Sequence, residues 1–89
     1  MRLNFYYPDN TRSSLTIDDK LCDVWALATG RRDLPSVDVN RDLAEEVIPE
    51  ALKHYNDAGR TLTKQTEWEM LEEIACAIQF DYVRKGDNL

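Results

Sequence analysis

Apolar and polar side chains alternate along the first seventeen residues, as expected for an extended chain with one buried face. Pro, Asp and Asn at residues 8–10 interrupt the alternation, which is clear again only from residue 14 to residue 17. Pro presets φ for a turn, Asp hydrogen-bonds nearby backbone and Asn tolerates a left-handed conformation. The pattern therefore predicts a β-hairpin over residues 1–17. The apolar face of that hairpin would consist of Leu3, Phe5, Tyr7, Leu15 and Ile17.

Three helical segments follow the hairpin, and each ends at a glycine. We expect helices from about residue 18 to 29 before Gly30, from 40 to 57 before Gly59, and from 64 to 85 before Gly86. Glycine after the last turn adopts the left-handed conformation that closes many helices. Residues 31–39 would form a loop. The candidate N-caps are Thr16 or Asp18, then Asp38 or Asn40, then Thr63.

Each helical segment has an apolar stripe, and the stripe of the third is the best patterned because it repeats at 3-4-3-4 spacing. We predict that this stripe is core, so Trp68→Ala or Leu71→Ala would cost about 2–5 kcal/mol. The pattern leaves open whether the third helix packs within one monomer or against a second copy. The stripes are Leu21, Val24, Trp25 and Ala28; Leu43, Val47, Ala51, Leu52 and Tyr55; and Trp68, Leu71, Ala75, Ile78 and Tyr82.

Pro49 lies inside the second helical segment. Proline has no N–H to donate, and its ring collides with the carbonyl four residues earlier. We therefore expect a kink or break near Ile48, or two short helices with Pro49 at the first position of the second. The fold class is α+β, a hairpin followed by three helices (ββααα), in one domain: hairpin 1–17, helical part 18–86 and tail 87–89.

Charge and composition exclude some classes of function. The 89 residues include 17 acidic and 11 basic side chains, a net charge of −6, which argues against a sequence-blind nucleic-acid binder. There is no signal-peptide pattern and no apolar run of membrane-spanning length, so we expect a cytoplasmic protein that does not bind membranes. Cys22 and Cys76 are expected to be buried, reduced thiols, although one disulfide is formally possible.

No pattern typical of catalysis or of a cofactor is present. His54 is the only histidine, lies near a helix end and follows no nucleophile motif. A zinc site built from Cys22, Cys76 and His54 would need a fourth ligand and lacks a recognised spacing. The sequence therefore predicts a protein that is not an enzyme and binds no metal or cofactor.

The acidity belongs to residues 33–89, which carry −7, whereas residues 1–32 carry +1. Small size and strong acidity favour a protein-binding module of the inhibitor, immunity, antitoxin or phage anti-defence type, from a mobile genetic element, that occupies a basic groove on a partner protein. A homodimer is also possible. The candidate contact residues are Glu45, Glu46, Glu50, Glu69, Glu72 and Glu73, with Tyr6 as an aromatic anchor.

An alternative function rests on residues 12–21, Arg-Ser-Ser-Leu-Thr-Ile-Asp-Asp-Lys-Leu, and the helix after them. This run resembles the strand and first helix of ribbon-helix-helix repressors, which are dimers that insert paired strands into the DNA major groove. The resemblance implies that Arg12, Ser14 and Thr16 read bases, with Arg2 on the same hairpin face. It extends only to about residue 56, and the long loop, the preceding strand and the acidic charge depart from the pattern.

Overall fold

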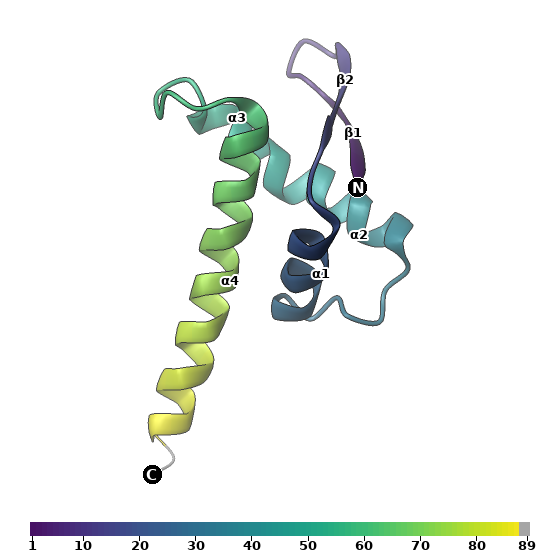
Figure 1. The fold of residues 1–89 in the computed structure, drawn as a ribbon. Coiled ribbons are helices and arrows are strands. Elements are labelled where there is room, and N and C mark those ends of the chain that lie inside the picture. The colour runs from purple at the N-terminus through teal and green to yellow at the C-terminus, as the bar shows by residue number, and fades with distance from the viewer. Residues whose placement is uncertain (88–89) are drawn as a thin grey trace.

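The protein is an α+β domain in which a two-stranded hairpin precedes the helices (Figure 1). This computed structural model describes the backbone of residues 1–87 and the side chains of residues 1–79. Tyr82 of the predicted third stripe and most of the predicted tail 87–89 lie outside this range. The elements are β1 (Arg2–Tyr6), β2 (Arg12–Thr16), α1 (Asp19–Ala28), α2 (Ser36–Asp42), the π-helical η1 (Leu43–Val47), α3 (Ile48–His54) and α4 (Leu62–Asp87).

The predicted hairpin is confirmed, together with its turn chemistry. The strands pair antiparallel in a register that places Leu3 opposite Leu15. Asn10 adopts the left-handed conformation with φ of 69°, and the Asp9 carboxylate accepts a hydrogen bond from the Thr11 N–H at 2.9 Å. The apolar face is buried except for a half-buried Tyr7. β2 therefore has β1 on one edge, where a ribbon-helix-helix strand would pair with a second copy.

Helix α1 begins and ends as the sequence predicts. Asp18 is the N-cap and accepts hydrogen bonds from the N–H groups of Lys20 and Leu21. Gly30 has φ of 77°, and the N–H after it bonds to the Ala26 carbonyl, as in a Schellman motif. The predicted stripe is partly wrong, because Val24 is exposed and the buried side chains are those of Cys22, Trp25 and Ala26.

The second predicted helix begins earlier than expected and consists of three joined pieces. It starts at Ser36, with Pro35 at the N-cap position, so neither Asp38 nor Asn40 caps it. The π-helical turn η1 comes directly before α3, whose second residue is Pro49. A wider turn accommodates the missing donor and the bulky ring of proline. The kink itself stays a prediction, while α3 ends at His54, earlier than predicted, and Gly59 closes the following turn with φ of 69°.

Helix α4 is the longest element, and both of its predicted ends are wrong. Thr61, rather than Thr63, caps it, because the Thr61 side chain accepts a hydrogen bond from the Lys64 N–H at 3.2 Å. Gly86 lies inside the helix, which continues to Asp87. The 26 residues span about 39 Å. Figure 1 shows the C-terminal part of α4 running beyond α1, so much of this helix has no helix beside it.

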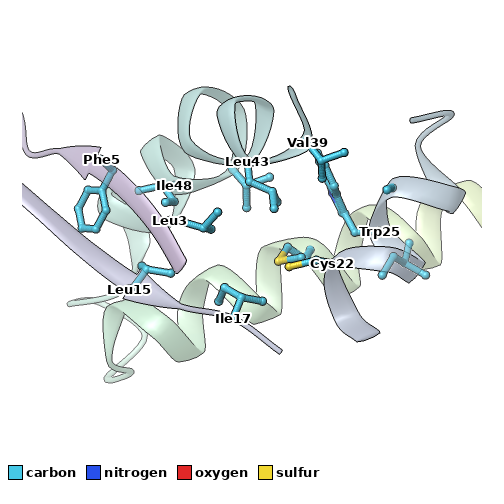
Figure 2. Packing of buried hydrophobic residues seen from close by; sticks show 13 residues of the cluster. Leu3, Phe5, Leu15, Ile17, Cys22, Trp25, Val39, Leu43 and Ile48 are labelled. Atoms are coloured by element: carbon cyan, nitrogen blue, oxygen red, sulfur yellow. The ribbon is translucent and has the colours of Figure 1, made fainter. Parts of the chain in front are cut away.

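The core lies between the hairpin, the helices from α1 to α3 and one side of α4 (Figure 2). Among the side chains described for α4, those of residues 62–79, Met70 and Ile74 are the buried apolar ones and Gln65 and Thr66 the buried polar ones. Thr66 donates to the Leu62 carbonyl, so its hydroxyl is satisfied within the helix. The other core residues are Leu3, Phe5, Leu15, Ile17, Cys22, Trp25, Ala26, Val39, Leu43, Val47 and Ile48.

The prediction that the 3-4-3-4 stripe of α4 is core is wrong. Trp68, Leu71 and Ile78 are 44%, 51% and 62% exposed. Cys76 is exposed as well, contrary to expectation, whereas Cys22 is buried. The side of the helix that faces the domain instead carries Met70 and Ile74, which fill the space left by the hairpin and α1. Its most apolar stripe therefore faces solvent.

This orientation predicts opposite outcomes for two neighbouring residues. Met70→Ala removes a fully buried side chain and should lower the free energy of unfolding by about 2–4 kcal/mol. Leu71→Ala removes a half-exposed one and should cost less than about 1 kcal/mol. Urea denaturation followed by tryptophan fluorescence measures both. A larger loss for Leu71→Ala than for Met70→Ala would contradict the orientation of α4.

Candidate functional site

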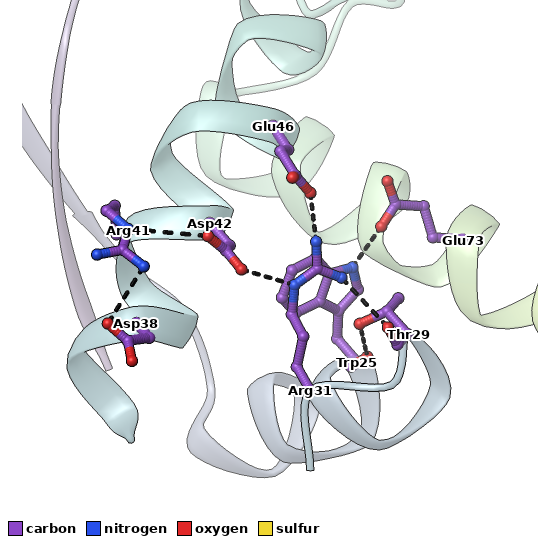
Figure 3. Close-up of polar contacts among 8 residues, drawn as sticks. All are labelled: Trp25, Thr29, Arg31, Asp38, Arg41, Asp42, Glu46 and Glu73. Carbon is purple, nitrogen blue, oxygen red and sulfur yellow. Dashed lines mark hydrogen bonds and ion pairs between the residues drawn. The ribbon is translucent and has the colours of Figure 1, made fainter. Parts of the chain in front are cut away.

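An arginine clamp joins the end of α1 to α2, η1 and α4 (Figure 3). The Arg31 guanidinium lies over the Trp25 ring, 4.6 Å from its centroid. It donates through Nε to Asp42 at 2.8 Å and through an Nη to Glu46 at 2.6 Å. The indole N–H of Trp25 donates to Glu73 on α4. The clamp therefore connects the end of α1 to α2, η1 and α4.

The clamp is held by charge in a partly desolvated place. Side chains of Arg31 and Asp42 are about four-fifths covered. The hydrogen bond to Asp42, the largest cause, raises the pKa of Arg31, and the charge of Glu46 acts in the same direction. Charge-assisted bonds and a cation over an indole each stabilise such an arrangement. Two predicted partner-binding residues, Glu46 and Glu73, therefore have internal contacts.

The remaining predicted contact residues are distributed over the surface. Glu50 pairs with Lys53 at 3.1 Å, with the His54 ring 3.7 Å away. Glu69 accepts a hydrogen bond from Gln65. Glu45 and Glu72 are exposed and form no ion pair within residues 1–79. Tyr6, 64% exposed, lines the same groove as Glu45.

The exposed stripe of α4 continues onto α1 and forms an exposed apolar surface. We name this surface the α4 outer face: Trp68, Leu71, Ala75 and Ile78 of α4, with Val24 and Leu27 of α1. Val24 and Leu27 meet Ile78 across an open groove of about 370 Å³. Arg60 covers one side of Trp68, 4.6 Å from the ring centroid. The sequence pattern identified the α4 residues of this surface but assigned them to the core.

The polar face of the hairpin carries the residues of the DNA-binding alternative. Arg2 lies opposite Thr16 in the register, and the Arg2 Nε donates to the Ser14 hydroxyl at 3.3 Å. Arg12 and Thr16 are exposed on this face. The structure thus brings all four residues onto one face of the hairpin, where Ser14 is partly buried, and their role in binding DNA stays a prediction.

The described part of the chain contains little that resembles a catalytic centre. Burial raises the pKa of the Cys22 thiol to about 11, so this thiol is protonated at neutral pH and is a poor nucleophile. Over the same residues, no group of three His, Cys, Asp or Glu side chains is arranged to hold a metal ion. No helix within the described range is long and apolar enough to cross a membrane.

Comparison of the chain with protein-family models, with curated proteins and with solved structures gives no match. The candidate surfaces are therefore judged on their own geometry. Sequence reasoning missed the clamp, since nothing in the spacing of Trp25, Arg31 and Glu73 indicates that they meet. The one available signal was an arginine directly after the helix-ending Gly30, where a Schellman motif turns the chain back towards its helix.

The clamp predicts that Arg31 contributes more to stability than Arg41, an arginine that also forms ion pairs with α2 carboxylates. Arg31→Met leaves Asp42 without its closest partner and should lower the free energy of unfolding by about 2 kcal/mol. Arg41, whose side chain is more exposed, pairs with Asp38 at 3.2 Å, and Arg41→Met should cost less than about 1 kcal/mol. Urea denaturation at low and high salt measures the free energy of unfolding of both variants. Equal losses would show that the clamp contributes no more than a surface ion pair.

Proposed function

We propose that this chain is a small, non-enzymatic protein-binding module that docks through the α4 outer face. The observation that supports the proposal most directly is the exposure of Trp68, Leu71 and Ile78 on one side of a long helix. Contiguous apolar surface with a polar margin is typical of protein interaction sites. Isolated helices are only marginally stable in water, so the part of α4 beyond α1 gains stability from a partner that covers it.

Charges beside the stripe favour one kind of partner. In the heptad that Trp68 and Leu71 define, Glu67 and Glu72 occupy the flanking positions on either side. Glu67 is 3.8 Å from Lys64, whereas Glu72 forms no ion pair with any residue from 1 to 79. Two copies packed through this stripe would bring these carboxylates together. An amphipathic helix with an apolar stripe and flanking Lys or Arg is the complementary occupant.

A basic partner fits the acidic composition of this chain, which favours a protein of the inhibitor type. The net charge of −6 accelerates encounter with a basic surface. Inhibitors, immunity proteins, antitoxins and phage anti-defence proteins act by covering a functional surface of another protein and need no active site of their own. In this proposal Glu67 and Glu72 form the acidic margin, while Glu46 and Glu73 chiefly hold the helices together.

The proposal is tested on the partner recovered by affinity capture from the native host and then purified. Trp68→Ser and Leu71→Ser should each weaken binding about tenfold or more, as expected for residues near the centre of an interface. Glu72→Arg should slow association and reduce its dependence on salt. Titration calorimetry and surface plasmon resonance measure these effects.

Leu34→Ser is the matched control, because Leu34 is an exposed apolar residue in the loop before α2. The affinity of the Leu34→Ser variant for the partner should stay within about twofold of the affinity of the unsubstituted chain. If the control weakens binding as much as Leu71→Ser, or if light scattering shows only a homodimer that Leu71→Ser dissociates, the proposed occupant is wrong.

The second candidate function is DNA binding through the hairpin, supported by the shared exposed face of Arg2, Arg12, Ser14 and Thr16. Under this alternative, mobility shifts with duplex DNA should weaken steeply as salt increases, and Arg12→Ala should lose affinity. Lys53→Ala serves as a control outside the hairpin. The absence of any shift at low salt would exclude this alternative.

A further inference from the structure

Strand β1 has an edge whose backbone groups point away from its partner strand. The Tyr7 N–H donates to the Thr11 carbonyl, and the Ile17 N–H donates to the Met1 carbonyl. In an antiparallel ladder such hydrogen-bonded pairs alternate along the strand. The backbone N–H and C=O groups of the odd-numbered residues of β1 therefore point towards β2. The N–H and C=O groups of Arg2, Asn4 and Tyr6 face outward, and no backbone bond from them to another element is formed within residues 1–87.

A groove runs along this edge, and its opposite wall is helical. It has a volume of about 540 Å³. Arg2, Asn4 and Tyr6 line one side, and the stretch from Val37 to Glu45 on α2 and η1 lines the other. Residues 2–6 extend over about 14 Å, close to the roughly 12 Å that the helical wall spans. The groove therefore matches about four residues of an extended chain.

The charge of the groove indicates what it binds. At the start of β1, the Arg2 guanidinium contacts the Ser14 hydroxyl but forms no ion pair within residues 1–79. A carboxylate would be its natural partner.

We propose that this groove binds an extended segment of a partner protein, which adds to β1 as a third strand. Backbone groups of Asn4 and its outward-facing neighbours supply the pairing. Small apolar side chains of the segment face Val37 and Ala44, which line the helical wall. An acidic side chain of the segment pairs with Arg2. The site is separate from the α4 outer face and does not depend on it.

Peptide selection tests the proposal. Short random peptides displayed on phage are selected on the full chain, and the enriched sequences are synthesised. They should contain an acidic residue next to alternating small apolar residues. Methylation of the peptide backbone nitrogens, one at a time, should abolish binding at every second position only, because alternate N–H groups of an added strand point away from its neighbour. Hydrogen exchange should slow at the amides of Asn4 and Tyr6.

Asn4 and Thr16 provide a matched pair of variants, since each is an exposed, even-numbered residue of the ladder, Asn4 in β1 and Thr16 in β2. Both backbone N–H groups point outward, so proline at either position keeps the ladder between β1 and β2. Asn4→Pro blocks the edge that lines the groove and should weaken peptide binding about tenfold or more. Thr16→Pro alters the other edge and should leave affinity within about twofold. Thermal melting checks that both variants fold.

Several outcomes would overturn the proposal. These are a selection that enriches no peptide, equal sensitivity to methylation at every position on the unsubstituted chain, or a peptide that Leu71→Ser releases and Asn4→Pro does not. A homodimer that Asn4→Pro dissociates would show that a second copy, rather than a partner segment, occupies the edge. Because Leu71→Ser leaves the groove intact, loss of the proposed docking through α4 and loss of strand addition are distinguishable.

Discussion

The position of Trp25 is the constraint on which the rest of the structure depends. Its ring is fully buried in a domain of 89 residues, and its one polar atom is satisfied by Glu73 on α4. Arg31 covers the ring and is itself held by Asp42 and Glu46. A buried indole with a satisfied N–H, beneath a paired guanidinium, ties α4 to α1 and to the helical stretch from α2 to η1. These contacts fix which side of α4 meets the core.

Because the domain is small, part of its apolar surface is left exposed to solvent. A chain of this length buries a limited share of its surface, and the hairpin, α1 and η1 use most of the interior. Helix α4 contributes Met70 and Ile74 to the core, and the α4 outer face is left exposed. The surplus apolar surface on α4 and the open edge of β1 lie on different elements. The molecule therefore has two surfaces of different chemistry, an apolar helix with acidic margins and a polar strand edge beside Arg2.

Features that depend on neighbours in the sequence were predictable. The hairpin, its turn at Asn10, the Asp18 cap and the glycine that closes α1 all follow from local backbone preferences. The early start of α2 and the continuation of α4 through Gly86 were not predictable, because helix ends depend on small differences between competing local interactions. The sequence showed that acidic residues are concentrated in the helical part. Nothing in their spacing distinguished Glu73, bound to Trp25, from Glu72, which is left exposed.

The amino-acid sequence was sufficient to establish the α+β class, the order of hairpin and helices, the two faces of the hairpin and the concentration of acidity in the helical part. Each of these follows from periodicity, turn residues or composition. Which residues of α4 are buried, and which carboxylates Arg31 binds, became known from the three-dimensional packing. Periodicity shows that a helix has an apolar side, but not whether this chain or another molecule covers it. That choice depends on how side chains distant in sequence fill the same space.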